Sequence, residues 1–316
     1  MLALLTRRLL VGLATLVAVS VLIFLATVVL PGNAATAILG QTATPERVAL
    51  LEEQLHLTDS VPQQYAQWAG NMITGDPGES LVNGRTVWSL VRPALINSAF
   101  LVVVAGLLGS LLAAALGVLA AVRRDGVFDH VSSVLALAST SLPEFVVGIG
   151  LVTVFATVVS HALPAVSTVP PGANPWDDLA LVVLPIATLV ILIVPYIFRM
   201  ARAAMIDALD SEYVETARLS GIKPARIVLR YALPNAFAPT IQVVGLTLLY
   251  LAGGIVFVEY VFAYPGIGQA LVNAVSARDV PTIQLIVLVL ALFYVVVNIL
   301  TDMLALASVP RRRLPR

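Results

Sequence analysis

The sequence predicts an all-α integral membrane protein with six transmembrane helices and a structured external segment between the first and second of them. Hydrophobic residues make up 59% of the chain and charged residues 11%, whereas roughly a quarter of the residues in an average soluble domain are charged. Six long apolar stretches follow one another along the chain, and basic residues gather in the connections on one side of them. Together these features indicate one membrane domain.

A membrane-spanning helix needs about 20 apolar residues, because the hydrocarbon core is about 30 Å thick and each helical residue rises about 1.5 Å. The first apolar stretch follows two arginines and is longer than the roughly 7 to 15 residues of a signal-peptide core, so it is expected to remain as a membrane anchor. Prolines predict kinks in the third span, at Pro143, and in the fourth, at Pro185 and Pro195. The predicted spans cover approximately residues 9–30, 97–121, 131–159, 179–198, 236–260 and 283–307.

The positions of Lys and Arg predict the orientation, since basic loops remain in the cytoplasm. Fourteen of the 18 basic residues fall on one side of the predicted spans. The opposite side holds Arg47, Arg85, Arg92 and Arg278. Both termini are therefore expected in the cytoplasm, together with a connection at residues 199–235.

The external segment, residues 31–96, is too long for a simple connection and is expected to contain short amphipathic helices. In "TPERVALLEEQLHL", Thr44 is a favourable N-cap and Pro45 suits the first helical position. In "PQQYAQWAGNMITGD", apolar residues recur with helical spacing and the pattern stops at Gly75. These helices either cap the bundle or also form part of a docking surface or substrate gate.

Several kinds of chemistry lack the residues that they require. The net charge is zero, so the basic footprint of a nucleic-acid-binding protein is missing. There is no cysteine, which excludes a thiolate metal site and a cysteine nucleophile. Lys223 is the only lysine and Pro224 follows it, so the chain lacks the Gly-Lys-Ser/Thr end of a phosphate-binding loop. The sequence therefore predicts no ATPase site and no catalytic residue in this chain.

Metal binding and intramembrane hydrolysis are also disfavoured. His56, His130 and His161 show no paired-ligand spacing, and none lies deep in a predicted span where it could activate a serine. An ATPase-independent secondary carrier or channel remains an alternative. A proton-coupled carrier would usually show more buried carboxylates, or unwound helices in two matching halves.

Charged residues inside spans are costly and mark transport pathways by default. Glu144 follows Pro143 deep in the third predicted span. Glu259, at the outer end of the fifth span, and Asp302, near the inner end of the sixth, lie close enough to an interface to reach water or a neighbouring arginine. Glu144 is therefore the strongest pathway candidate of the three.

The cytoplasmic stretch "EYVETARLSGIKPARIVLRYALPN", residues 212–235, predicts a helix, a bend and a second helix. Asp210 and Ser211 are favourable capping residues for the first helix, and Gly221 can adopt the left-handed backbone that closes it. Pro224 suits the start of the second helix, which runs to Leu233-Pro234, where the fifth span begins. A rigid protrusion of this kind is suited to being moved by another protein.

This stretch resembles the EAA loop of the permease subunits of ABC importers, whose pattern is Glu-Ala-Ala, then Gly, then Leu-Pro. The triplet is filled by Glu215, Thr216 and Ala217, with Gly221 at the glycine and Leu233-Pro234 at the end. Thr216 in place of alanine and a tyrosine at the usual isoleucine position are mild departures.

The resemblance extends over nearly the whole chain. "RRLLVGLATLVAVSVLIFLATVVLPG", "ATPERVALLEEQLHL", "QYAQWAGNMITGDPGESL", "SLPEFVVGIG" and "VEYVFAYPGIGQALVNAVSARDVPTIQ" are similar, in the same order, to segments of the B-type permease of dipeptide and oligopeptide importers. Val309 departs from the usual Asp-Pro-Arg ending of the tail, which puts only a local tail contact in doubt.

The resemblance implies a type I ABC importer permease in the bacterial inner membrane. Its expected partners are a homologous second permease, two cytoplasmic ATPases that bind ATP and Mg, an external solute-binding protein, membrane lipid and a peptide substrate. No cofactor is expected in this subunit. Dipeptides, oligopeptides, glutathione-like peptides, and nickel or haem chelates all remain possible cargoes for permeases of this kind.

The resemblance also assigns roles to residues. The expected parts are an N-terminal helix with the external segment (1–96), a five-helix permease core (97–307) and a basic tail (308–316). The residues themselves, independently of the resemblance, provide candidates for the translocation path: Pro143, Glu144, Gly253, Gly254 and Glu259. Glu144 and the paired glycines are expected to face the second permease, because glycines let backbones approach closely and a carboxylate avoids lipid. Candidates for coupling to the ATPases are Glu212, Glu215, Thr216, Ala217, Gly221, Lys223, Leu233 and Pro234.

Overall fold

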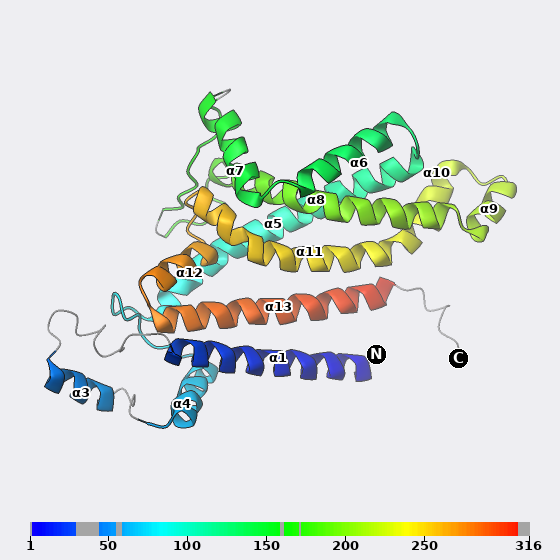
Figure 1. Ribbon diagram of the computed structural model, residues 1–316. Coiled ribbons are helices and arrows are strands. Elements are labelled where there is room, and N and C mark those ends of the chain that lie inside the picture. Colours follow the sequence, from blue (N-terminus) through cyan, green and yellow to red (C-terminus); the bar gives the residue numbers. More distant parts are fainter. Residues whose placement is uncertain (1, 30–43, 55–58, 159–160, 171, 309–316) are drawn as a thin grey trace. The chain divides into compact units, whose positions relative to one another are not determined.

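The computed structural model describes residues 2–29, 44–54, 59–158, 161–170 and 172–308, and most of these residues are helical (Figure 1). The chain divides into two compact units, the first formed by Met1–Ile96 with Gly266–Val295 and the second by Asn97–Pro265 with Val296–Arg316. Helices α5 (Val87–Val122) and α13 (Val280–Ser308) each contribute to both units. The division into the parts 1–96, 97–307 and 308–316 stays a prediction.

Among the described residues, five helices are long and apolar enough to cross a membrane, and a sixth crossing results if one strongly bent pair counts as a single span. The all-helical membrane fold is therefore confirmed. The candidate spans are α1 (Leu2–Val29), α5, α8 (Ala180–Leu209), the run Pro224–Val261 and α13. The bent pair joins α6 (Val127–Thr140) to α7 (Glu144–Val152) and the π-helix η2 (Thr153–Val158).

The third predicted span is broken rather than kinked. Its two halves meet at an angle of 106° across residues 141–143. Pro143 is the N-cap of α7, with φ −62° and ψ 149°. Proline has no N–H to continue a helix, and its ring disfavours helical backbone at the preceding residue, Leu142. One kinked helix over 131–159 is therefore the wrong description, and Glu144 begins a new helix instead of continuing an old one.

Two helices extend further than their apolar stretches predict. α5 begins at Val87 rather than at residue 97, and α8 continues to Leu209 rather than ending at 198. At the start of α5, Val87 and Val91 are completely buried. At the end of α8, the inward face carries Ala201, Ala204, Met205 and Ala208, all buried. Buried residues on one face keep a helix stable beyond the apolar stretch.

In the first unit, helix α4 (Val61–Thr74) packs against α1 through aromatic rings. Tyr65 and Trp68 both lie 5.4 Å from the Phe24 ring, centroid to centroid, and the Tyr65 hydroxyl is 2.8 Å from Ser20 Oγ. The helix ends at Gly75 with φ 86°, as the sequence predicts. α4 therefore covers part of the first helix.

Helix α3 (Pro45–Gln54), from the same stretch between the first two spans, also starts as predicted. The backbone N–H of Arg47 lies 3.4 Å from the Thr44 hydroxyl oxygen. Asp279 organises a turn elsewhere in this unit, since its carboxylate accepts hydrogen bonds from the Ser80 hydroxyl at 2.5 Å and the Leu81 N–H at 3.1 Å. A short apolar helix that the sequence analysis missed, α12 (Ile267–Ser276), packs its Ile267 beside Val87 and Ile286.

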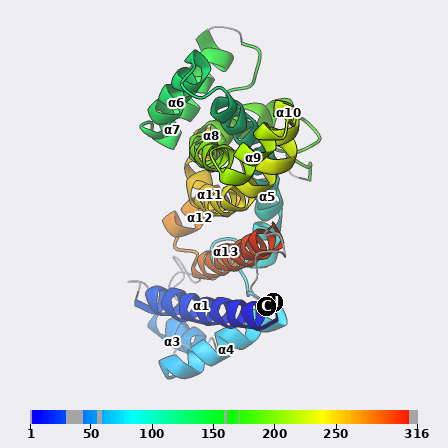
Figure 2. The same cartoon turned by 90° about the vertical axis from the view of Figure 1, so that its right-hand side faces the viewer.

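In the second unit, α8 and α11 (Leu233–Val261) pack side by side, with α6 and α7 against α8 (Figures 1 and 2). α5 also approaches α8 closely, because a Cβ at Gly117 would lie 2.7 Å from the Phe198 carbonyl oxygen. A buried cluster made mostly of alanine, on α5, α8, η3 (Val228–Ala232) and α11, fills the end of the bundle: Ala121, Ala204, Met205, Ala208, Ala232 and Ala236. Small residues permit this close helix packing, which holds the site described next.

Candidate functional site

The predicted helix–glycine–helix segment is present at residues 210–235, here named the coupling segment. α9 (Glu212–Leu219) is followed by Gly221 with φ 75°. α10 (Pro224–Ile227) begins with Pro224. The left-handed glycine and the proline at the first helical position are both confirmed. Figure 1 shows α9 and α10 beyond the ends of α8 and α11.

A small apolar core holds the two short helices together. It consists of Val214, Ala217 and Ile227, with Leu209, Ile222 and Tyr231 packed around them. Ala217 is only 5% exposed, whereas its neighbours Glu215 and Thr216 are exposed. Ala217 therefore stabilises the coupling segment from inside, and the other two residues of the triplet are the ones able to touch a partner.

The start of α9 differs in one respect from the sequence prediction. Ser211 is the N-cap, with extended backbone at φ −78° and ψ 150°, but its side chain does not cap the helix. Its hydroxyl donates to the Ala208 carbonyl at 2.6 Å, and the Asp210 carboxylate accepts from Arg124 Nη1 at 2.8 Å. Side-chain capping by these two residues is therefore a wrong prediction, because both side chains bind elsewhere.

The second short helix is continuous with the spanning helix that follows it. Residues 224–261 form one helical run, with the π turn η3 just before Leu233 and Pro234. Pro234 cannot donate a backbone hydrogen bond to Arg230 and its ring crowds that carbonyl, which accounts for the wider turn. α10 and α11 therefore belong to one helical run.

The outward face of the coupling segment combines charge with one large apolar side chain. Leu219 is 84% exposed at the last position of α9. Sequence analysis missed it, although it lies off the face defined by Val214 and Ala217. Such an exposed leucine suits a contact with another protein. Of the other predicted coupling residues, Leu233 is half-buried, and Glu212, Glu215, Thr216, Lys223 and Pro234 are exposed.

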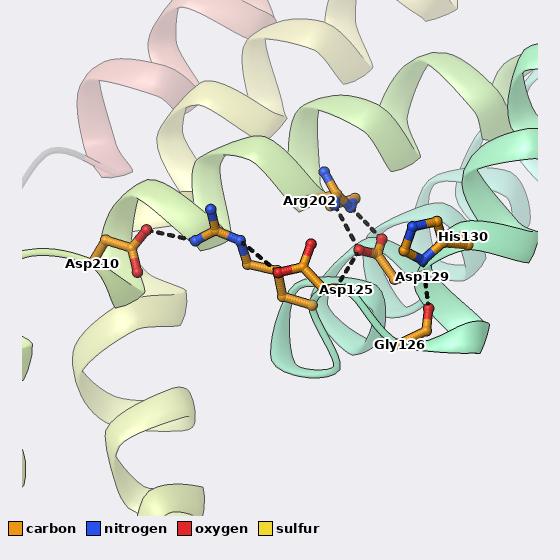
Figure 3. A network of polar contacts seen from close by, with 7 residues as sticks. Asp125, Gly126, Asp129, His130, Arg202 and Asp210 are labelled. Atoms are coloured by element: carbon orange, nitrogen blue, oxygen red, sulfur yellow. Dashed lines mark hydrogen bonds and ion pairs between the residues drawn. The ribbon is translucent and has the colours of Figure 1, made fainter.

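A buried ion pair fixes α6 to α8 near the base of the coupling segment (Figure 3). Arg202 Nε donates to Asp129 Oδ1 at 2.5 Å, and Arg202 Nη2 donates to Asp129 Oδ2 at 2.7 Å. The Asp125 N–H donates to the same Oδ2 at 3.1 Å. The Asp129 side chain is 3% exposed. This two-point geometry is the strongest form of an arginine–carboxylate contact.

A second, exposed ion pair extends the network to the coupling segment itself. Arg124 lies in the turn between α5 and α6, and its Nη1 atom is 2.8 Å from Asp210 Oδ2. The His130 ring also contacts this turn, since its Nδ1 atom lies 3.0 Å from the Gly126 carbonyl oxygen. The sequence alone gives no means of pairing these residues, because each pair joins helices far apart in the chain.

A polar cavity of about 270 Å³ opens at the break between α6 and α7. Glu144 lines it at the first position of α7 and accepts a hydrogen bond from the Tyr250 hydroxyl of α11. Tyr196 of α8 forms another wall, with its ring centroid 5.9 Å from that of Tyr250. Residues 139–143 and Leu192 complete the lining. The predicted pathway residues Pro143 and Glu144 thus share one cavity.

The predicted glycine pair divides between two environments. Gly254 is buried, and a Cβ there would lie 3.7 Å from a Glu144 carboxylate oxygen. Gly253 is exposed, with open space where a side chain would stand. Gly254 therefore packs against this chain's own α7, and Gly253 is the one of the two that leaves room for a neighbouring protein.

Glu259 lies apart from this cavity lining and is completely buried. It accepts a hydrogen bond from the Ser98 hydroxyl. Nearby, the Tyr264 hydroxyl donates to the Asn97 carbonyl at 3.0 Å, and Asn97 Nδ2 donates to the Pro265 carbonyl at 2.9 Å. Burial raises the pKa of Tyr264, so its hydroxyl remains a donor. These contacts tie α5 to the end of α11.

These observations describe a multi-pass helical membrane protein in which a protruding helix pair is joined directly to a spanning helix. The comparison with known families is specific. The chain belongs to the family described as binding-protein-dependent transport system inner membrane component, and the model of this family matches residues 113–314. The N-terminal region of the same type of membrane component matches residues 1–88. The chain is thus the permease subunit of an ABC importer.

Relatives and solved structures agree with this family. The chain is 33% identical over 309 residues to the probable peptide ABC transporter permease protein y4tP of Sinorhizobium fredii, covering 97% of this chain and 98% of that protein. It is also 33% identical over 307 residues to the glutathione transport system permease protein GsiC of Escherichia coli, covering 97% of each chain. In fold it is similar to a chain of the inward-facing MetNI methionine ABC transporter, with a TM-score of 0.58, 18% identity, and coverage of 70% of this chain and 97% of that one.

Proposed function

We propose that this permease carries short peptides and that it forms the translocation path together with a homologous second permease. Two of its relatives are named for peptide and for glutathione transport, and glutathione is itself a peptide. The cavity beside Glu144 supplies a polar surface within the helix bundle. Gly253, with open space beside it, lies on the face proposed to meet the second permease.

The driving force comes from two cytoplasmic ATPase subunits, which bind the ATP and Mg that this chain lacks the residues to hold. The observation that carries this proposal is the continuous run of residues 224–261, which joins the coupling segment to a spanning helix without a flexible joint. Closure of the ATPases moves α9 and α10, and α11 moves with them. Glu212, Glu215, Thr216, Lys223 and Leu219 form the contact surface.

The complex resides in a bacterial inner membrane with both termini of this chain in the cytoplasm. An external solute-binding protein delivers the peptide on the opposite side, where the external helices of the first unit lie. This orientation follows from the unequal distribution of Lys and Arg.

Copurification and transport test the proposal together. This chain, tagged, is expressed with the second permease, ATPases and binding protein encoded beside it, and the purified assembly is placed in liposomes. We expect both ATPases to copurify and labelled dialanine to enter only with ATP and the binding protein. Entry without ATP, driven by an ion gradient, would instead establish a secondary carrier.

A further inference from the structure

We propose that the cavity at the α6–α7 break binds the free α-ammonium group of the transported peptide, with Glu144 as its charge partner. This inference rests on the peptide cargo of the proposed function and names the part of the peptide that this chain recognises. The carboxylate comes from α7, and the two tyrosine walls come from α8 and α11.

The cavity lies at a similar distance along three helices from their ends near the coupling segment. Tyr196 is about 20 Å along α8 from Leu209, at a rise of about 1.5 Å per residue. Ser139 and Thr140 are about 20 Å along α6 from Val127, and Tyr250 is about 25 Å along α11 from Leu233. The Arg124–Asp210 ion pair marks the ends of α6 and α8 at one level. The cavity therefore lies at about the same level on all three helices, away from the ends that this ion pair marks.

The Glu144 carboxylate has an unmet demand for hydrogen-bond donors. Among the described residues, the hydrogen bond that Glu144 accepts is the one from the Tyr250 hydroxyl. An ionised carboxylate offers about four acceptor positions, and basic side chains are missing from the lining of this cavity. A charged carboxylate within the helix bundle of a membrane protein normally has a partner, and a positively charged ligand would supply it.

The geometry favours an ammonium group over other cations. Tyr250 already engages one carboxylate oxygen, which disfavours the parallel two-point contact that a guanidinium group prefers. The described residues contain no cluster of three or more His, Cys, Asp or Glu side chains able to hold a metal ion. An ammonium group needs only about three acceptors. The Tyr250 hydroxyl donates its hydrogen bond to Glu144, so the lone pairs of its oxygen remain available to accept a hydrogen bond from the ammonium group.

The size of the cavity fits one end of a peptide. Pockets for drug-sized ligands usually measure about 300 to 1,000 Å³, and the cavity volume of about 270 Å³ lies just below that range. Tyrosine rings can contribute cation–π attraction to an ammonium group. Arg199 covers the Tyr196 ring at 5.7 Å, so Tyr250 is the ring available to the ligand. The peptide beyond its first residues would extend out of the cavity.

A cysteine reporter tests the proposal in the complete transporter. The chain contains no cysteine, and Ser141 is an exposed residue of the cavity lining. Labelling of Ser141→Cys by a maleimide is measured with dialanine, N-acetyl-dialanine or alaninamide, without the binding protein. Asn83→Cys, in the external segment, is the control reporter. At a concentration ten times the dissociation constant, dialanine and alaninamide should slow labelling of Ser141→Cys about tenfold, and N-acetyl-dialanine should not.

Removing the carboxylate provides the second arm. In the Ser141→Cys/Glu144→Gln double variant, dialanine should slow labelling less than about twofold, with the ATPases still bound as a sign of a folded complex. Equal protection by the acetylated peptide, equal protection in the double variant, or no protection by any probe would each overturn the ammonium site. Peptide uptake measured on the same complex separates the two claims. ATP-dependent uptake without protection leaves the proposed function intact, whereas protection without such uptake removes the proposed function and keeps the site.

Discussion

Arg202 of α8 donates two hydrogen bonds, of 2.5 and 2.7 Å, to the carboxylate of Asp129 on α6. The Asp129 side chain is only 3% exposed. Arg124 and Asp210, in the same network, lie 2.8 Å apart with side chains 49% and 60% exposed. Figure 3 shows Arg202 with Asp129, and Asp210 at the start of the coupling segment. The buried pair joins the helices, and the exposed pair ties the α5–α6 turn to the residue just before α9.

The two ion pairs should differ strongly in their contribution to stability. Asp129→Ala leaves Arg202 without its charge partner, and we expect the free energy of unfolding to fall by about 3 kcal/mol, as for other broken buried pairs. Arg124→Ala, at the exposed pair, should cost less than about 1 kcal/mol because solvent screens both charges. Unfolding of the purified protein by titration with a denaturing detergent measures both values.

A double variant separates the ion pair from simple loss of side chains. Asp129→Ala with Arg202→Ala should cost less than the sum of the two single changes, since no buried charge is left unpaired. Additive costs would show that the two side chains stabilise the fold independently, in conflict with the two-point contact.

Gly221→Val tests whether the angle between α9 and α10 transmits force. A β-branched residue in a left-handed conformation is strained by about 1–2 kcal/mol, although the space around Gly221 is open. We expect the variant to reach the membrane in normal amount, release the ATPases in detergent and lose peptide uptake. Gly221→Asn is the matched control, because asparagine tolerates this backbone, and it should keep uptake. Normal uptake by the valine variant would show that the bend merely closes a helix.

Variants at Leu219 and Val214 should distinguish an effect on ATPase binding from an effect on the free energy of unfolding. Leu219→Ser removes an exposed side chain, so we expect little change in unfolding and a weakening of ATPase binding by about 2 kcal/mol, roughly thirtyfold in affinity. Val214→Ala opens the core of the coupling segment and should cost about 1.5–3 kcal/mol of stability. Glu215→Lys should resemble Leu219→Ser. ATPase retention in detergent and unfolding of the isolated chain check the pattern, and unchanged retention in both surface variants would contradict it.

Tyr264→Phe tests the buried hydroxyl that binds the Asn97 carbonyl. Near neutral pH the variant should be less stable by about 1–2 kcal/mol, because a buried acceptor loses its donor. Burial raises the pKa of Tyr264 above its usual value of 10.0. Above pH 10 the unfolded tyrosine ionises and the folded one does not, so the wild-type protein loses stability as pH rises. The difference between the two proteins should therefore shrink, and a constant difference up to pH 11 would rule out the buried neutral hydroxyl.

Single cysteines test the orientation of the chain. Asn83→Cys and Asn174→Cys should react with a membrane-impermeant maleimide on intact cells. Ala225→Cys and Val127→Cys should react only after permeabilisation. Val127 is preferable to Asp125 as the reporter in the α5–α6 turn, because Asp125 has φ 63° and Val127 is 82% exposed. Labelling of Ala225→Cys from outside would place the coupling segment on the wrong side for cytoplasmic ATPases.

Local features of the sequence determined much of this protein. Hydropathy averaged over about 20 residues located the apolar spans, since a helix in lipid must satisfy its own backbone and expose apolar side chains. Gly221 predicted its own left-handed backbone, and Pro224 and Gly75 predicted where helices begin and end, because these preferences belong to single residues. The family pattern at Glu215, Gly221 and Pro234 could be recognised from the sequence because it too consists of single residues at fixed positions.

Tertiary structure alone decided which distant residues meet. Pro143 predicted an interruption, but the angle of 106° depends on how α7 packs against α8 and α11. Asp129 and Arg202 are 73 residues apart in sequence, and Glu144 and Tyr250 are 106 apart. No local preference specifies such pairs. They follow from which helices are neighbours and from the rotation of each helix about its axis, and the same rotation turned Ala217 inward and left Leu219 exposed.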